Sequence, residues 1–525
     1  MDTKALRQKI LDLAIRGKLV PQDSNDEPAS ILLEHIRQQK QQMVKDGKLK
    51  AKDIKNDTVI FVGEDNLHYE KFQDGSVKYI EDEIPFELPE GWAWARLGTV
   101  FSTVTGATPS TKDASLYGTD YPFYKPTDLD AGYNVCGAED SVSEKGYLSG
   151  RPLPKFSVLV TCIGATIGKT GYISNAGICN QQINAVLPNS EVLSDYTYFC
   201  MCSQYEQQQI WTNSSATTLP ILNKSKFDNL LFPIPPHEQQ AQIVERIKGL
   251  FSFVEKIQSN QESLKTTVAI AKSKILDLAI RGKLVPQDPN DEPASILLER
   301  IRAEKEELIK QGKIKRDKKE SIIFKGEDNS YYEKIGSEMR CIDSEIPFDL
   351  PESWIFTRLK HIGEVIGGGT PKTNIDEYWD GNIPWLTPAD LSGYEDVYIL
   401  TGARTITELG LKSSSAQMLP KNSILYSSRA PIGYIAIAAN PISTNQGFKS
   451  VVPYNFAMSP YLYYCLKART SDIVQRATGT TFKEISGSEM AETIIPLPPI
   501  DEQQRIFDKV TQLLEALSTI EKSLN

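Results

Sequence analysis

A phosphate-binding loop is the first chemistry to test, because GATIGKT at 164–170 combines glycines with a lysine and a threonine. A loop that cradles nucleotide phosphates needs four residues between its glycines, followed by Lys-Ser or Lys-Thr. Here Gly164 and Gly168 enclose three residues, and the corresponding segment SRAPIGYI at 428–435 has no lysine. The spacing favours a glycine-containing turn between two strands. A nucleotide-hydrolysing enzyme that uses Lys169 is the less favoured alternative.

Other catalytic and metal-binding patterns are missing from the sequence. The four histidines (35, 68, 237 and 361) lie far apart, and the seven cysteines form no CxxC pair. Zinc sites and disulfide frameworks need closer spacing than this. The sequence has no GxSxG nucleophile motif, and no Asp/Asn/Ser-Pro-Pro-Tyr/Phe motif of the kind amino-methyltransferases use. We therefore expect no catalytic residue, no metal site and no cofactor bound by this chain.

Polar loop residues point to binding. Thr, Ser, Asn, Gln, Lys and Arg on loops can contact base edges and phosphates, although Thr-Pro and Asn-Gln also form turns and caps. A surface salt bridge is the alternative role for a cation such as Lys169 or Arg429. The candidate DNA-contacting residues are Thr108, Ser110, Lys112, Lys125, Thr127, Thr166, Lys169, Asn180, Gln181, Thr370, Lys372, Thr373, Thr387, Ser428, Arg429, Asn445 and Gln446.

An internal duplication organises these candidates. Residues 10–37 and 275–302 are identical at 26 of 28 positions. The match then continues more weakly, with IPFELPEGW at 84–92 returning as IPFDLPESW at 346–354. Because the offset between the copies stays nearly constant at about half the chain length, the repeat fills the whole sequence.

The expected fold is α+β, with two strand-rich heads separated by long helices. Charged, glutamine-rich segments alternate with segments rich in Gly, Pro, Thr and short β-branched runs, which is typical of helices and compact β-rich domains respectively. The predicted organisation is a helical region with a connector at 1–83, a head at 84–236, a long helix with a helical arm and a connector at 237–345, a second head at 346–499, and a terminal helix at 500–525.

A heptad seam predicts how the helices pair. Apolar residues alternate at steps of four and three along the central helix, with one polar interruption at Gln261. Such a pattern is typical of a coiled coil. The C-terminal segment repeats the first half of the seam, and Leu6, Ile10 and Leu13 repeat the second half. The seam residues are Ile243, Ile247, Leu250, Val254, Ile257, Leu264, Val268, Ile275, Ile506, Val510, Leu513, Leu517 and Ile520.

The split second copy of the seam predicts an antiparallel, pseudo-two-fold and nearly circular arrangement. In it, the helices that carry Met1 and Asn525 meet beside the central helix. Two independent domains in tandem are the alternative, because a recent duplication would leave a similar repeat. The continuous seam favours the first interpretation.

Composition sets a constraint on any nucleic-acid role. The 525 residues include 58 Lys+Arg and 68 Asp+Glu, for a net charge of −10, and neither head has an excess of basic residues. An acidic protein does not hold DNA by long-range electrostatics. The sequence has no run of apolar residues long enough to span a membrane, and its start, MDTKALRQKILD, has no apolar signal core. A cytoplasmic location is expected.

Several segments resemble one family. The run at 378–391 (YWDGNIPWLTPADL), the LPKFSVL and LPKNSIL turns at 153–159 and 419–425, the PLPPIDEQQRI segment at 496–506, and the LAIRGKLVPQ block, which occurs twice, carry the resemblance. Together with the repeat and the split seam, they make the chain similar to the specificity subunit of type I restriction–modification systems, in the branch with extended helical regions. The resemblance covers essentially the whole length.

The resemblance implies a DNA-reading subunit without catalytic activity. Each head would be a target-recognition domain for one half of a bipartite double-stranded DNA site. The helices would set the spacing and dock two modification (methyltransferase) subunits, which bring S-adenosylmethionine, and a restriction/translocase subunit would add ATP and Mg. A coiled-coil assembly scaffold whose heads bind protein is the alternative from another class.

Overall fold

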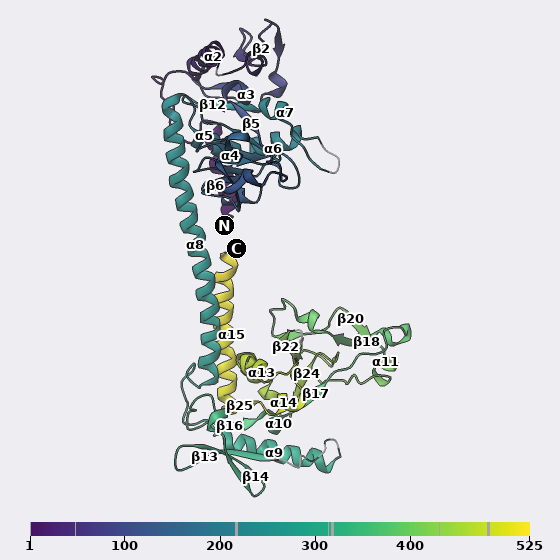
Figure 1. The fold of residues 1–525 in the computed structure, drawn as a ribbon. Coiled ribbons are helices and arrows are strands. Elements are labelled where there is room, and N and C mark those ends of the chain that lie inside the picture. Colours follow the sequence, from purple (N-terminus) through teal and green to yellow (C-terminus); the bar gives the residue numbers. More distant parts are fainter. Residues whose placement is uncertain are drawn as a thin grey trace. The chain divides into compact units, whose positions relative to one another are not determined.

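The computed structural model describes residues 2–47, 49–215, 219–312, 314, 316, 320–429, 431–479 and 483–524. The chain forms two compact units, Met1–Gln261 and Glu262–Asn525, coloured purple to teal and teal to yellow in Figure 1. Each unit combines helices with small sheets, which confirms the predicted α+β class and internal duplication. Met1 and Asn525 lie outside the described residues. No helix in the described part is long and apolar enough to cross a membrane.

The first unit and the long helix that leaves it contain these elements. The helices are α1 (Thr3–Ile15), α2 (Ala29–Lys45), α3 (Leu97–Val100), α4 (Glu144–Ser149), α5 (Ser194–Met201), α6 (Gln204–Asn213), α7 (Lys224–Asp228) and α8 (His237–Ile280). The strands are β1 (Val59–Val62), β2 (His68–Lys71), β3 (Val77–Tyr79), β4 (Ala93–Arg96), β5 (Thr103–Thr105), β6 (Tyr117–Tyr124), β7 (Asp140–Val142), β8 (Val158–Thr161), β9 (Thr170–Tyr172), β10 (Ile178–Cys179), β11 (Ile183–Val186) and β12 (Leu231–Ile234).

The second unit repeats this order. Its helices are α9 (Ala294–Lys310), α10 (Leu359–Ile362), α11 (Glu408–Lys412), α12 (Ser459–Ala468), α13 (Thr470–Arg476), α14 (Gly487–Ala491) and α15 (Ile500–Ser523). Its strands are β13 (Ser321–Lys325), β14 (Tyr331–Ile335), β15 (Glu338–Cys341), β16 (Ile355–Arg358), β17 (Gly363–Gly367), β18 (Trp379–Leu386), β19 (Tyr398–Ile399), β20 (Arg404–Ile406), β21 (Ile424–Ser428), β22 (Ile432–Ala438), β23 (Ser443–Thr444), β24 (Lys449–Pro453) and β25 (Ile494–Leu497).

The ends of each head are joined by a strand pair. β4 pairs with β12 and β16 pairs with β25, both antiparallel, so each head starts and finishes at the same place. A tryptophan fixes that place to the following helix. Trp92 Nε1 donates to Gln239 Oε1 of α8 at 3.0 Å, and Trp354 Nε1 donates to Glu502 Oε2 of α15 at 2.9 Å.

The repeated LAIRGKLVPQ block contains a glycine at which a helix ends. Gly17 follows α1 and Gly282 follows α8, with φ of +64° and +65°. A side chain at Gly17 would place its Cβ 2.4 Å from the Pro89 ring, and one at Gly282 would place it 2.5 Å from the Pro351 ring. Both the left-handed backbone and the close approach require glycine. This requirement explains why the glycine is retained in both copies.

Each head contains two further sheets besides the strand pair that joins its ends. In the first head, β10-β6-β7 and β5-β11-β8-β9 are the strand orders, and β10 pairs with β6 in parallel. In the second head, the orders are β20-β18-β23 and β17-β24-β21-β22-β19, with β18 and β23 parallel. The parallel pair brings the end of the long strand beside the residues that follow the short one.

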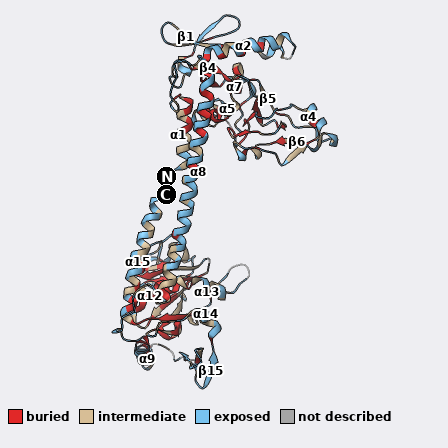
Figure 2. Ribbon diagram, turned by 90° about the vertical axis from the view of Figure 1, so that its left-hand side faces the viewer, coloured by how far each residue is buried: buried red, intermediate tan, exposed pale blue. Residues whose placement is uncertain are grey.

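The predicted central helix is confirmed as α8, which is 44 residues long. Within the first unit, α1 lies antiparallel to it, with Arg7 3.3 Å from Glu255. Within the second unit, α15 lies antiparallel to its last turns, with Lys272 2.5 Å from Glu521. Figure 2 shows that the buried residues gather in the heads and beside them, while much of α8 is exposed. The fully buried seam positions are Ile243, Ile247, Val254, Val268, Ile506 and Val510.

The rest of the seam is less covered than the heptad pattern predicts. Leu250, Ile257, Ile275, Leu513 and Leu517 are half-buried. Leu264 and Ile520 are 44% and 42% exposed, so the expectation of a closed seam is wrong at these two positions. Leu264 lies two turns before Lys272, which is already opposite the last turn of α15, and Ile520 belongs to that last turn. A heptad pattern cannot show where the partner helix ends.

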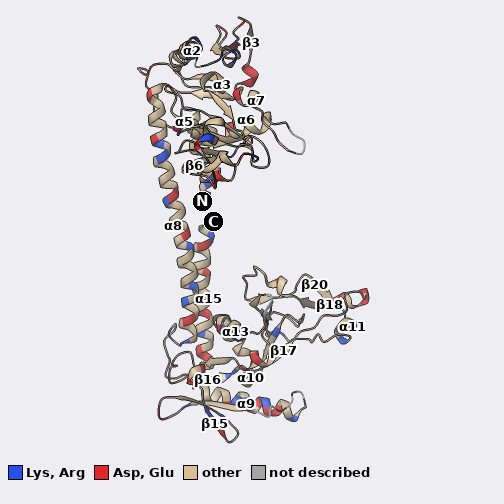
Figure 3. Cartoon of the chain, in the orientation of Figure 1, with Lys and Arg blue, Asp and Glu red and all other residues tan. Residues whose placement is uncertain are grey.

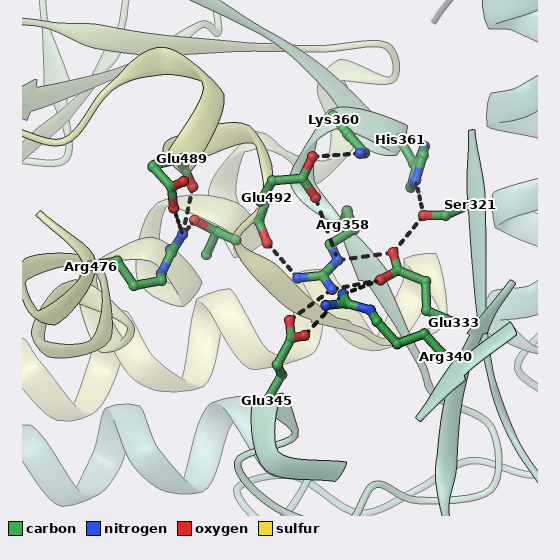
Figure 4. Close-up of polar contacts among 11 residues, drawn as sticks. Ser321, Glu333, Arg340, Glu345, Arg358, Lys360, His361, Arg476, Glu489 and Glu492 are labelled. Atoms are coloured by element: carbon green, nitrogen blue, oxygen red, sulfur yellow. Dashed lines mark hydrogen bonds and ion pairs between the residues drawn. The ribbon is translucent and has the colours of Figure 1, made fainter. Parts of the chain in front are cut away.

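The segments expected to be connectors fold into three-stranded sheets instead. β13-β14-β15 is held to β16 of the second head by a buried ion-pair network around Arg358 (Figure 4). Arg358 Nη2 donates to Glu333 Oε2 at 2.7 Å and to Glu345 Oε2 at 2.8 Å, and Arg340 Nη2 donates to Glu333 Oε2 at 2.9 Å. The side chains of Arg358 and Glu333 are 5% and 3% exposed.

The first unit repeats this network. Arg96 Nη2 donates to Glu70 Oε2 and Glu83 Oε2, both at 2.7 Å. Burial by itself raises the pKa of Glu333, but hydrogen bonds from Arg358, Ser321 and Arg340 outweigh it and lower that pKa to about 2. At pH values above 4.5, the ordinary pKa of a glutamate, ionised Glu333 therefore stabilises the fold. This contribution is lost as the pH falls towards 2.

We expect E333Q to lower the free energy of unfolding of the second unit by about 3 kcal/mol at pH 7, because it leaves Arg358 buried without its main carboxylate. The difference from the wild type should shrink as the pH falls from about 4.5 towards about 2, since both proteins then lack the carboxylate charge. Denaturant unfolding across this pH range measures it. E338Q, at an exposed position of the same sheet, is the matched control. A difference that does not change with pH would contradict the assignment.

Candidate nucleic-acid interface

Three segments meet at one edge of the first head. The loop after β5 is bonded to the end of β10, with Ala107 N donating to Cys179 O at 2.8 Å. The residue after β10 is bonded to the end of β6, with Asn180 N donating to Tyr124 O at 3.1 Å. The Thr108 hydroxyl then donates to Gln181 Oε1 at 2.5 Å. Residues separated by more than 70 positions therefore share one polar edge.

The second head builds the same edge from the corresponding segments. Gly369 N donates to Thr444 O at 2.9 Å, and Asn445 N donates to Leu386 O at 2.8 Å. The Thr370 hydroxyl donates to the side-chain oxygen of Gln446, as Thr108 does to Gln181. The sequence singled out these loop, strand-end and Asn-Gln segments, and the structure brings them together in both heads. We call each assembly a reader edge.

The two asparagines of the Asn-Gln pairs shape turns. Asn180 Oδ1 accepts from Gln182 N at 3.1 Å, and Asn445 Oδ1 accepts from Gly447 N at 2.8 Å. Asn180 is 8% exposed, whereas Gln181 and Gln446 are exposed. The asparagine of each pair therefore fixes the backbone, and the glutamine is the side chain that a ligand can reach.

Three predicted cations are already paired. Lys125 forms an ion pair with Asp140, and this hydrogen bond raises the pKa of Lys125 above its ordinary value. Lys169 lies 2.6 Å from Asp130, and Arg429 lies 3.7 Å from Glu484. A ligand would have to compete with these carboxylates, so the salt-bridge alternative describes the three cations in the unbound chain.

Two other predicted cations have no such partner. Lys112 and Lys372 are exposed on the reader-edge loops. Among the described residues, no carboxylate lies within ion-pair distance of either amine. Thr373, Ser110 and Thr127 are also exposed and available.

Two predicted residues already form hydrogen bonds within the head. Ser428 is fully buried and donates its hydroxyl to Gly447 O at 3.1 Å, which leaves it no exposed polar group. The Thr387 hydroxyl donates to Asp390 Oδ2 at 2.8 Å, where it stabilises a turn. The direction of a strand's side chains depends on its register, which the sequence alone did not give.

GATIGKT is a turn between two antiparallel strands, β8 and β9, as the spacing indicates. A phosphate loop would instead lead from a strand into a helix. Thr166 is exposed in this turn, and its carbonyl accepts from Lys169 N at 3.0 Å. The described residues also contain no group of three or more His, Cys, Asp or Glu side chains placed to hold a metal ion.

Aromatic residues beneath the reader edges were missed by the sequence analysis. The Tyr117 hydroxyl donates to Pro109 O at 2.9 Å, and Trp379 Nε1 donates to Lys372 O at 3.2 Å. Each anchors its loop from the first residue of the long strand, β6 or β18. Arg404 on β20, which stacks on Trp379, was also missed. The signal available was the aromatic that starts each long strand, but its partner depends on tertiary contacts.

The charges around the edges are mixed. Figure 3 shows acidic and basic residues interspersed in both heads and along α8. The first head has nine Lys and Arg against thirteen Asp and Glu, and the second has twelve against fourteen. The edges therefore offer polar groups suited to directional hydrogen bonds, with little net attraction for a polyanion.

Known proteins share the sequence and the architecture of this chain. Over 98% of this chain and 90% of the relative, it is 26% identical to the type I restriction enzyme EcoAI specificity subunit of Escherichia coli. It is 49% identical to the MjaIX specificity subunit of Methanocaldococcus jannaschii over 30% of this chain, spanning 37% of that relative. The crystal structure of the HsdS subunit from Thermoanaerobacter tengcongensis has the same fold, with a TM-score of 0.51 at 17% identity over 84% of this chain and 94% of that one.

The family described as "Type I restriction modification DNA specificity domain" matches residues 89–266 and 351–525, which contain all but the first five residues of each head, most of α8 and all of α15. Specificity subunits are separate from the enzymatic subunits of these systems, so the expectation of a non-catalytic chain is confirmed by the relatives. With two matched domains that cover about two thirds of its length, this chain belongs to the type I restriction–modification specificity family.

Proposed function

We propose that each head reads one half of a two-part DNA site for a type I methylation and restriction complex. The observation that carries the proposal is the duplicated reader edge, in which the same backbone contacts appear twice. A Thr-Gln hydrogen bond, an Asn-stabilised turn and an aromatic-anchored loop recur in both heads. Such a framework holds polar side chains at defined positions, as base readout requires.

The side chains at matching positions of the two edges differ while the framework is shared. Ser110 corresponds to Lys372, and Lys125 corresponds to Thr387. Asp140 and Arg404 occupy equivalent places, opposite Phe123 and Trp385 respectively. Two readers with different donors and cations on one scaffold should prefer different sequences, so the proposed DNA site has two unlike halves.

The helices supply the spacing and the partner contacts in this proposal. The seam from Ile243 to Leu278 would span about 50 Å at ~1.5 Å per residue, which is the order of distance between readers on successive turns of DNA. Phe253 and Ile270 of α8 are 62% and 65% exposed, and such apolar groups suit protein contacts. We assign the docking of two methyltransferase subunits to these helices.

The chemistry belongs to the partners. The methyltransferase subunits would bring S-adenosylmethionine and methylate adenine, and the restriction/translocase subunits would use ATP and Mg. The role of this chain is to place those subunits at a chosen sequence.

Methylation sequencing of DNA from source cells, with and without this gene, tests the proposal. We expect one gapped, two-part methyladenine motif to disappear when the gene is removed. If no motif changes in cells that produce the partner subunits, DNA readout is contradicted and a protein scaffold becomes the better account.

The unpaired lysines predict a salt-dependent effect. We expect K112A and K372A each to weaken DNA binding by the assembled complex and to reduce the slope of log K against log salt by about 0.9, the change for one lost phosphate contact. Filter binding at several salt concentrations measures it. K155A, an exposed lysine before β8 and away from the reader edge, is the control. Unchanged slopes for both variants would exclude these phosphate contacts.

The acidic heads predict that this chain alone binds DNA weakly. Because phosphate neutralisation supplies much of DNA affinity, we expect a Kd of roughly 10⁻⁴ to 10⁻⁶ M at physiological salt for the purified chain. Binding should become tighter and sequence-specific when the methyltransferase subunits are added. Fluorescence anisotropy with cognate and scrambled duplexes measures both states. Tight specific binding by the chain alone would show that the partners are not needed for phosphate contacts.

A further inference from the structure

Arg404 lies over an aromatic ring in the second head. Its guanidinium carbon lies 3.6 Å from the centre of the Trp379 ring. Trp379 in turn packs edge-on against Trp385, with ring centres 5.1 Å apart. Stacking on an indole restricts the rotamers of an arginine while leaving its N–H groups available in the plane of the guanidinium. Arg404 is therefore pre-oriented before any ligand binds.

The stack belongs to the reader edge. Trp379 Nε1 and Trp385 Nε1 donate to the loop carbonyls of Lys372 and Gly369, at 3.2 and 2.9 Å. Arg404 pairs with Trp385 across the β18–β20 ladder. The two indoles thus connect Arg404 with the Lys372 loop. Trp385 is followed directly by Leu386, the last residue of β18, whose carbonyl accepts from Asn445 N.

The charge of Arg404 is not neutralised. Its side chain is exposed, and in the described ranges no carboxylate lies within 4.0 Å of its guanidinium. By contrast, Lys125, Lys169 and Arg429 each have an acidic partner. An ordered, exposed and unpaired arginine has its hydrogen-bonding fork free for a ligand.

The equivalent position in the first head has the opposite charge. Asp140 lies opposite Phe123 on β7, as Arg404 lies opposite Trp385 on β20. Asp140 neutralises Lys125 in the first head, while the residue equivalent to Lys125 in the second head is the uncharged Thr387. One site on a shared framework thus has a free guanidinium in one head and a carboxylate in the other.

We propose that Arg404 is a specificity-determining residue that reads a guanine through its base edge in the half-site bound by the second head. This inference rests on the proposed DNA-reading function. Guanine presents two acceptors, O6 and N7, in the major groove, and the fork of an arginine matches both. The first head, with Asp140 at this place, does not make that contact.

The test uses the assembled methylation complex with wild-type chain, R404A or R404K. Methylation rates are compared between the cognate duplex and duplexes in which each guanine of the motif is replaced in turn. For R404A, discrimination at one guanine of one half-site should fall by about 10- to 100-fold, the range for loss of one bidentate base contact. The other half-site should be read as before. R404K should not restore the discrimination, because an ammonium cannot form the bidentate pair.

The controls separate the possible failures. K421A changes an exposed lysine in the turn before β21, at the other end of that strand from Arg429, and should leave discrimination unchanged. A melting temperature for R404A close to that of the wild type excludes misfolding. If the melting temperature of R404A is clearly lower, the same discrimination is measured with R404K and R404Q instead. Unchanged discrimination, equal weakening on all duplexes, or rescue by R404K would overturn the inference, the last two because they indicate a phosphate contact. If the wild-type complex methylates no gapped DNA motif, the proposed function itself is refuted.

Discussion

The pairing of the first and last strands of each head is the constraint on which the rest of the structure depends. Because β4 pairs with β12 and β16 with β25, the first and last residues of each head lie side by side. Trp92 and Trp354 join that point to the adjacent helix, through Gln239 and Glu502 respectively. The reader-edge loops lie between these two strands, and so do α5 and α12, which pack against the helices in the two hydrophobic cores.

This closure explains the pattern of divergence. Near-identical residues occupy the helix ends and the block around Gly17 and Gly282, where a side chain would collide with a proline of the head. The reader edges keep their backbone contacts but exchange their outward residues. Rigid attachment and variable edges are the combination that a protein with two different binding preferences needs, and it arises here from one duplicated plan.

The sequence predicted those parts of the structure that depend on local periodicity and on repetition. The heptad seam predicted α8, and the repeat predicted two equivalent units. The spacing of GATIGKT predicted a turn. Grouping the Thr-containing loops with the Asn-Gln pairs as binding candidates was also possible, because both recur in each copy at matching places.

The remainder depends on contacts between residues distant in the sequence. The burial of Ser428 follows from strand register, and the exposure of Leu264 follows from where α15 ends. The segments before each head were expected to be connectors, but they form sheets. Arg96 and Arg358 bind these sheets through carboxylates that lie 13 to 26 positions earlier in the sequence. The stack of Arg404 on Trp379 likewise needs the pairing of β18 with β20, which no spacing rule reveals.

The central claim is that each head reads DNA independently on a common scaffold. The most direct measurement replaces residues 346–499 by a second copy of 84–236 and sequences the methylated DNA of cells that produce this chain with its partner subunits. The account predicts a motif built from two copies of one original half-site. Retention of the original two-part motif, in a chain that is soluble and assembled but lacks the second head, would contradict it.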